Sequence, residues 1–177
     1  MKFLALTGTV LAGVAIVLVL SGGGDGQRPR SYTAPDRAFS LRHSGEWKPL
    51  AGRELAAVAG SPAAVLRRAD RRGLVVIRER QPAREGLRSF TERLTGELRH
   101  RFPGMRPVSA RSVAIRGGRA YLYTFVRPQA GTVHGIALAT AGRRAFSLDV
   151  VTPGDAPKAA AQVGAIVRSF GLPDESR

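Results

Sequence analysis

The chain has 177 residues, a length that favours one domain with short appendages. Apolar residues make up 44% of it, so a core can form, and disorder is disfavoured despite the net charge of +15. The sequence contains no cysteine, which excludes disulfides, thiolate metal sites, a thiol nucleophile and a lipidated cysteine as an anchor.

The basic residues are almost all arginines. Only three of the 28 are lysines, and asparagine does not occur. GC-rich codon usage produces the same bias without functional selection, so composition alone does not separate the two explanations. In either case, a domain this basic is expected to be attracted to anionic lipid, acidic polymers or nucleic acid.

The amino-terminal residues 3–20 form an uninterrupted stretch of 18 residues without a charge. As a helix this stretch would be about 27 Å long, close to the thickness of a hydrocarbon core. Residues 1–21 are therefore predicted to be a retained single-pass membrane anchor. A cleavable signal peptide is the alternative, but its apolar region is usually about 7–15 residues long and ends at a small-residue site. Residues 21–24 supply small residues without a clear site of that kind.

Two cues to the side of the membrane disagree. The positive-inside rule compares Lys2 with Arg28, Arg30 and Arg37, and it weakly favours a cytoplasmic domain. The short charged start followed by an apolar stretch resembles an export signal. We expect the domain to lie on the extracytoplasmic side.

The remaining chain is divided by composition. Residues 22–31, rich in glycine and then polar, are predicted to be a flexible linker. A globular domain is predicted over 32–172 and a tail over 173–177. Its first strands are expected from alternating or continuous apolar residues bounded by glycine, serine and proline. These segments are 38–42, 54–59, 63–68 and 74–78.

The second half of the domain predicts two helices and two hairpins. Apolar residues at helical spacing predict a helix over 86–102, and Asp155 and Pro157 favour the start of another over 155–170. Gly117-Gly118 predicts a type I′ hairpin between 112–116 and 119–126, and a second hairpin is expected between 132–140 and 144–151. The predicted fold class is α+β: a central antiparallel sheet flanked by two main helices, an α/β/α sandwich, plus the N-terminal transmembrane helix.

Three segments resemble the PsbP-like superfamily. They are the strand and turn of Phe39–Trp47, the glycine pair within Arg116–Tyr121 before a long strand, and the closing helix that ends at Val167–Phe170. The resemblance covers roughly residues 32–172 and is closest in character to exported actinobacterial LpqN-like proteins, although the lipidated cysteine is absent. It implies an α/β/α sandwich with a binding or accessory role, and it assigns no functional residue.

Side chains suited to catalysis or metal binding are scattered along the chain. His43, His100 and His134 lie on separate predicted elements without metal-ligand spacing, and His43 and His100 are expected at the surface. Ser147, His134 and Asp149 could share a face of paired strands, but small polar residues on a sheet are common. We therefore predict no catalytic, cofactor or metal site.

Arginines at two predicted turns are the candidate contacts for an anionic surface. They are Arg67, Arg68, Arg71, Arg72, Arg143 and Arg144, and they would form one basic patch if both turns pointed the same way. The alternative is that they are simply solvated. Nucleic-acid binding is less favoured, because Tyr121, Tyr123 and Phe125 alternate on one strand face as core residues do, and Trp47 also suits a core.

The combined expectation is a membrane-anchored extracytoplasmic binding or accessory module without catalytic activity. Its expected partners are the membrane itself and an anionic lipid, a cell-wall polymer or a membrane protein complex. A cytoplasm-facing nucleic-acid-binding domain is the alternative, and an enzyme comes third.

Overall fold

The structure is a computed structural model that describes residues 28–81, 86–141 and 144–173. The predicted membrane anchor lies outside these residues. Within the described ranges, no helix has the length and apolar character needed to cross a bilayer.

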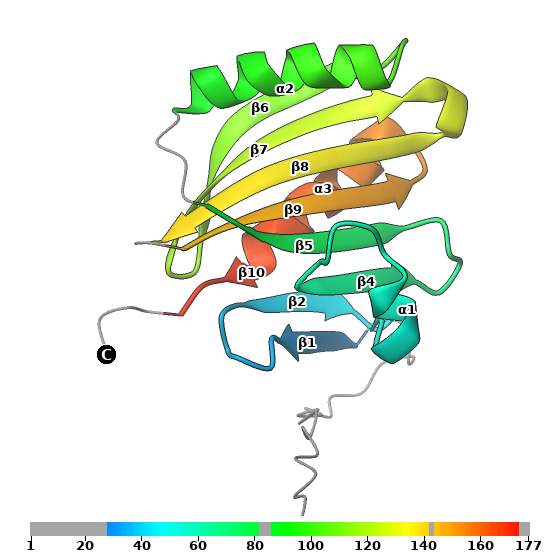
Figure 1. Cartoon of the computed structure of the whole chain (residues 1–177). Helices are drawn as coiled ribbons and strands as arrows, with labels where there is room; N and C mark the ends of the chain where they lie inside the picture. Colours follow the sequence, from blue (N-terminus) through cyan, green and yellow to red (C-terminus); the bar gives the residue numbers. More distant parts are fainter. Residues whose placement is uncertain (1–27, 82–85, 142–143, 174–177) are drawn as a thin grey trace, which may run out of the picture.

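Ten strands form two antiparallel sheets in the described part of the chain (Figure 1). The larger sheet has the order β3-β4-β5-β9-β8-β7-β6, and the smaller has the order β1-β2-β10. The larger contains β3 (Trp47–Pro49), β4 (Ala64–Arg68), β5 (Leu74–Arg80), β6 (Arg106–Ile115), β7 (Gly118–Arg127), β8 (Thr132–Ala141) and β9 (Arg144–Pro153). The smaller contains β1 (Pro29–Thr33), β2 (Ser40–Ser44) and β10 (Phe170–Gly171). The helices are α1 (Gly52–Ala56), α2 (Leu87–Arg101) and α3 (Ala156–Ser169), with a 3-10 turn η1 (Pro128–Ala130).

Helix α2 covers one face of the larger sheet, over β6 and β7 (Figure 1). Its apolar stripe, as predicted from the spacing, buries Phe90, Leu94 and Leu98. These side chains pack in one cluster with Tyr123 and Phe125 of β7. The charged residues of α2 are exposed, and Thr95 adds a hydrogen bond from its Oγ1 to the Tyr123 hydroxyl at 3.1 Å.

Helix α3 and the smaller sheet cover the opposite face, where the main core lies. Val163 and Val167 of α3 are fully buried in this core. Phe39, just before β2, stacks on Phe170 of β10 with ring centroids 5.4 Å apart, and it meets Phe146 of β9 edge-on at 5.3 Å. Aromatic packing, together with an isolated bridge between Arg116 and Gly171, thus joins two sheets that share no strand.

The predicted α+β sandwich is confirmed, with one small sheet that was not predicted. The smaller sheet packs beside α3, so the order of layers is helix, seven-stranded sheet, then helix plus three-stranded sheet. Both predicted long helices and both predicted hairpins are present.

Several local predictions were wrong. Residues 52–56 form a helix where a strand over 54–59 was expected. Strand β1 begins at Pro29, so residues 29–31 belong to the smaller sheet rather than to the linker. The β6–β7 turn has a positive φ at Gly117 but not at Gly118, because Gly118 already pairs with Ile115. Asp155 occupies the N-cap of α3 but makes no side-chain cap hydrogen bond.

Candidate functional site

The β4–β5 turn (residues 69–73) does place arginines at one end of the molecule, but carboxylates neutralise two of the four. Arg67 pairs with Glu54 at 2.6 Å. Arg68 lies 3.3 Å from Glu46 and 3.4 Å from Asp70. Arg71 and Arg72 are exposed, and neither side chain pairs with a carboxylate of the described residues.

Arg144 lies at the other end of the sheet. Strand β5 pairs with β9 from Leu74–Val151 at one end to Arg80–Ala145 at the other. A strand of this length spans about 20 Å. The β4–β5 turn precedes Leu74, whereas Arg144 lies beyond the Arg80 end of the paired strands. The two turns therefore do not point the same way, which was the condition for a single basic patch. Arg143 lies outside the described residues.

The described chain starts at the same end as the β4–β5 turn. Pro29, the first residue of β1, pairs with Ser44 at the end of β2. Two residues further on, the Glu46 carbonyl accepts a hydrogen bond from the Ala69 N–H at 2.8 Å. Figure 1 shows β1 starting on the same side of the molecule as this turn. The described chain therefore begins at the end of the molecule that carries the β4–β5 turn.

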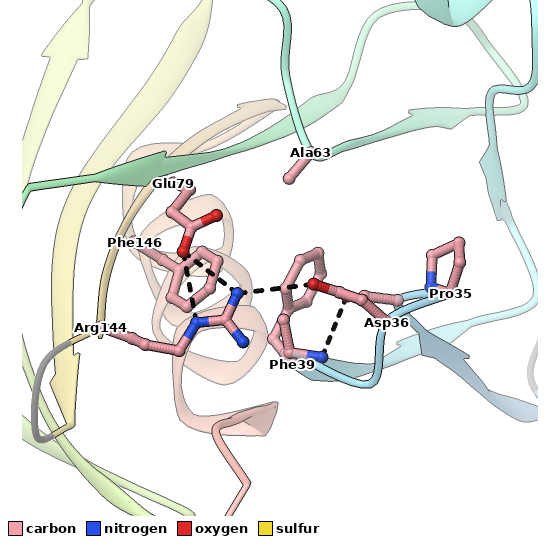
Figure 2. Close-up of a pocket in the computed structure, with 9 residues that line it drawn as sticks. Pro35, Asp36, Phe39, Ala63, Glu79, Arg144 and Phe146 are labelled. Atoms are coloured by element: carbon pink, nitrogen blue, oxygen red, sulfur yellow. Dashed lines mark hydrogen bonds and ion pairs between the residues drawn. The ribbon is translucent and has the colours of Figure 1, made fainter.

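Two hollows open at the opposite end, on either side of the loop 34–39. The first, here called the Arg144 pocket, has a volume of about 280 Å³. Figure 2 shows its Arg144 guanidinium held between two carboxylates, Glu79 at 3.1 Å and Asp36 at 3.4 Å. Phe39 and Phe146 line the same hollow. With two acids and one base, its polar groups are already paired, and the trio ties the loop to the larger sheet.

The second hollow, here called the Arg116 pocket, has a volume of about 450 Å³. Its polar side chains are two arginines and two hydroxyls, and none of the residues that line it is acidic. They are Thr33, Arg37, Phe39, Ser40, Arg116, Gly117, Gly171, Leu172 and Pro173. The Arg116 guanidinium donates a hydrogen bond to Ser40 Oγ.

The Ser147, His134 and Asp149 set does not converge. Ser147 Oγ accepts a hydrogen bond from Arg80 Nε at 3.1 Å, and Asp149 pairs with Arg78 at 2.8 Å. Burial raises the pKa of Asp149, although nearby arginines oppose the shift. His134 lies four residue pairs along the strands from Ser147, since it faces Val151 whereas Ser147 faces Leu138. Each of the three side chains therefore has a different partner.

His134 belongs to an aromatic stack instead. Its ring lies 5.0 Å from that of Phe125, and its Nε2 is 3.1 Å from Thr132 Oγ1. Burial, and secondarily the charge of Arg127, lower the pKa of His134 to about 4. A neutral, stacked imidazole of this kind is a structural residue.

The structure also places His43 and three of the aromatic candidates. His43 was expected at the surface but is buried in β2, where burial lowers its pKa and its Nδ1 lies 2.8 Å from the Ser44 carbonyl. Tyr123 and Phe125 are buried beneath α2, and Trp47 is buried in the main core, so none of these three rings offers a face on which bases could stack. In the described ranges, no three metal-ligating side chains gather into a group that could hold an ion.

Sequence reasoning overlooked Arg37 and Arg116. Both sit in turns, next to Asp36 and Gly117, which are ordinary places for a solvated arginine. The local signal that existed was the glycine after Arg116, which allows the close approach of another backbone. Nothing local indicated that this turn would meet the end of the chain.

Comparison with known proteins identifies the fold. The sequence matches no protein-family model and no curated protein. The solution structure of cyanobacterial PsbP (CyanoP) from Synechocystis sp. is similar, with a TM-score of 0.60 and 13% identity over 88% of this chain and 99% of that one. This likeness confirms the predicted PsbP-like fold.

Two further structures are more distant. One is LpqN, described as involved in cell envelope biogenesis of Mycobacterium tuberculosis, with a TM-score of 0.45 and 11% identity over 85% of this chain and 87% of that one. The other is a protein from Bacteroides thetaiotaomicron, with a TM-score of 0.49 and 13% identity over 86% of this chain and 50% of that one. At this distance neither likeness informs function.

Proposed function

We propose that this chain is a membrane-tethered accessory module whose domain lies on the extracytoplasmic side and acts by binding rather than by catalysis. One observation supports the proposal above all. The described chain starts at the end of the sandwich that carries Arg71 and Arg72, so the proposed tether joins the domain at the end with the unpaired arginines. The accessory role is the one that the PsbP-like resemblance implies, and a shared fold does not by itself assign it.

The tether is short enough for this end to meet the membrane. Seven residues, 22–28, separate the end of the predicted anchor from β1. Fully extended, they reach about 25 Å. Arg71 and Arg72 therefore stay within reach of the lipid headgroups, while the Arg144 and Arg116 pockets at the opposite end face away from the membrane.

The charge at this end determines how strongly the domain prefers to dock on an anionic membrane. A basic side chain near an anionic membrane surface contributes about 1 kcal/mol. Arg67 and Arg68 count for less, because their carboxylate partners cancel their charge. Arg71 and Arg72 together then supply about 2 kcal/mol, which is roughly a 30-fold preference for the docked orientation.

The absence of cysteine makes the test clean, since a single cysteine can be introduced as the only labelling site. Full chains that carry either Ala69→Cys in the β4–β5 turn, or Ala114→Cys in β6 at the opposite end of the domain, are spin-labelled and placed in nanodiscs with anionic lipid. We expect the label at position 69 to lie at headgroup depth and the label at 114 to lie in solvent. Replacing Arg71 and Arg72 by glutamine should release label 69, and so should raised salt, since the Debye length shortens.

The matched control replaces Arg99 and Arg119, two exposed arginines elsewhere, by glutamine. Equal release by both pairs would show that only the overall charge matters and would refute the docked orientation. The same cysteine chains test the side of the membrane, because a membrane-impermeant thiol reagent should modify position 114 in intact spheroplasts. Protection of that site until lysis would mean that the domain faces the cytoplasm.

A further inference from the structure

The Arg116 pocket differs from its neighbour in charge. The Arg144 pocket holds one arginine between two carboxylates, whereas the Arg116 pocket holds Arg37 and Arg116 with no acid among its lining residues. Two arginines facing one hollow repel each other unless an anion lies between them. We propose that the Arg116 pocket is a binding site for a phosphate group.

The loop 34–39 contributes to this difference, because its two adjacent charged residues line different pockets. Asp36 points into the Arg144 pocket, where it pairs with Arg144, and its other oxygen accepts the Ala38 N–H at 3.1 Å. Arg37 has a φ of 56°, in the left-handed region that non-glycine residues seldom adopt, and its N–H donates to the Ala34 carbonyl at 2.8 Å. Strained residues of this kind gather at functional sites. The turn thus places Asp36 in the Arg144 pocket and Arg37 in the Arg116 pocket.

The far wall of the pocket is built by two glycines. A Cβ on Gly117 would lie 2.5 Å from the Leu172 carbonyl oxygen, and one on Gly171 would lie 2.5 Å from Arg116 Nη2. These close approaches allow the Leu172 N–H to donate to the Arg116 carbonyl at 2.9 Å. Ser40 Oγ accepts from the guanidinium, so both the backbone and the side chain of Arg116 are held in place. The arginine is positioned before any ligand arrives.

The donors present favour phosphate over carboxylate. Two guanidinium groups can each offer a pair of parallel N–H donors, and the hydroxyls of Thr33 and Ser40 lie in the same lining. A carboxylate has two oxygens to satisfy such a set, and a phosphate has three or four. The volume of about 450 Å³ exceeds that of a single ion and falls within the range of small-molecule sites. The phosphate is therefore part of a larger molecule, with room beside the anion for its esterified group.

The pocket does not depend on the proposed tethering, because it lies at the end of the domain opposite the tether. Titration of the full chain in zwitterionic nanodiscs, followed by NMR shifts, keeps the two proposals separate. The probes are inorganic phosphate, glycerol 3-phosphate and acetate at constant ionic strength. We expect both phosphates to shift the resonances of 33–40, 116–117 and 171–172 and acetate to shift them weakly, with glycerol 3-phosphate binding more tightly than inorganic phosphate. Equal affinity for the two phosphates would refute the inference that the ligand is larger than phosphate, and would indicate a site for the free ion.

Three variants test the mechanism. Replacing Arg37 and Arg116 together by glutamine should weaken glycerol 3-phosphate binding at least tenfold. Gly171→Ala should weaken it several-fold without any change in charge, because the new Cβ displaces the Arg116 guanidinium. Arg119→Gln, on the same hairpin but outside the pocket, should change it less than twofold. Equal losses in all three variants, shifts that map elsewhere, or no binding of either phosphate in the millimolar range would each overturn the proposal.

Discussion

Gly135 in β8 is a position where one added methyl group should strongly destabilise the fold. A Cβ there would lie 2.2 Å from Val163 Cγ1 of α3 and 3.3 Å from Leu122 Cδ1. Carbon atoms in contact are separated by about 3.5–4.0 Å, so the helix would have to move away by more than about 1 Å. Val163 has little freedom to turn aside, because a β-branched residue in a helix has one strongly preferred rotamer. Overpacking of this kind costs about 1–3 kcal/mol, and we expect Gly135→Ala at the upper end.

The matched control is the same substitution at Gly96, on the exposed face of α2, where an added Cβ meets nothing within 4 Å. Removing a glycine from a helix interior should stabilise the protein by about 0.5–1 kcal/mol. Urea unfolding of the full chain in detergent can be followed by the fluorescence of Trp47, the single tryptophan, which is buried. Adding Val163→Ala should cancel part of the Gly135→Ala loss, because it removes the clashing methyl groups. If Gly135→Ala is as stable as the wild type, α3 does not lie directly on β8.

Two further predictions concern the other face of the sheet. Leu94→Ala should lower the free energy of unfolding by about 2–5 kcal/mol, since Leu94 is buried between α2 and the sheet; a loss below about 0.5 kcal/mol would mean that the stripe is not packed. The folded-state pKa of His134, about 4, lies below its ordinary value of 6.5, so its contribution to stability is present above pH 6.5 and is lost as the pH falls towards 4. His134→Phe keeps an aromatic ring beside Phe125 but removes the titrating group. Urea unfolding at pH 7, 5.5 and 4.5 should therefore show a smaller decrease in the free energy of unfolding for the variant than for the wild type. Equal decreases in the two proteins would contradict this reasoning.

The sequence reveals the elements whose signals are local. The stripe of Phe90, Leu94 and Leu98 is visible because three or four residues separate its members on one helix face. Strand β1 carries no such signal, since four of its five residues are exposed and no apolar alternation results. Helix α1 has only five residues, too few to display a helical period. Strand β10 has only two residues, and it is defined by its pairing with β2 rather than by a pattern in its own sequence.

Only part of the candidate site could be predicted from the sequence, because its residues come together through contacts that are distant along the chain. The arginines of the β4–β5 turn are evident in the sequence, but the carboxylates that neutralise two of them include Glu46 and Glu54, which lie on other elements. Whether two turns share an end of a sheet depends on strand order and register, which are properties of the whole fold. Arg37 and Arg116 are 79 positions apart, and only the docking of the chain end beside the β6–β7 turn brings them to one hollow.

The position of β2 between β1 and β10 also sets an order of events during synthesis. Strand β2 is made first, whereas Phe170, which pairs with Leu41 on its second edge, follows 129 positions later along the chain. Until Phe170 emerges, β2 keeps an unpaired edge, and Phe39 lacks the ring on which it stacks. An open strand edge beside exposed aromatic surface is the kind of intermediate that aggregates or recruits a chaperone. A nascent chain of this protein therefore needs protection until Phe170 and Gly171 have emerged, and a product that stops before Phe170 cannot close its smaller sheet.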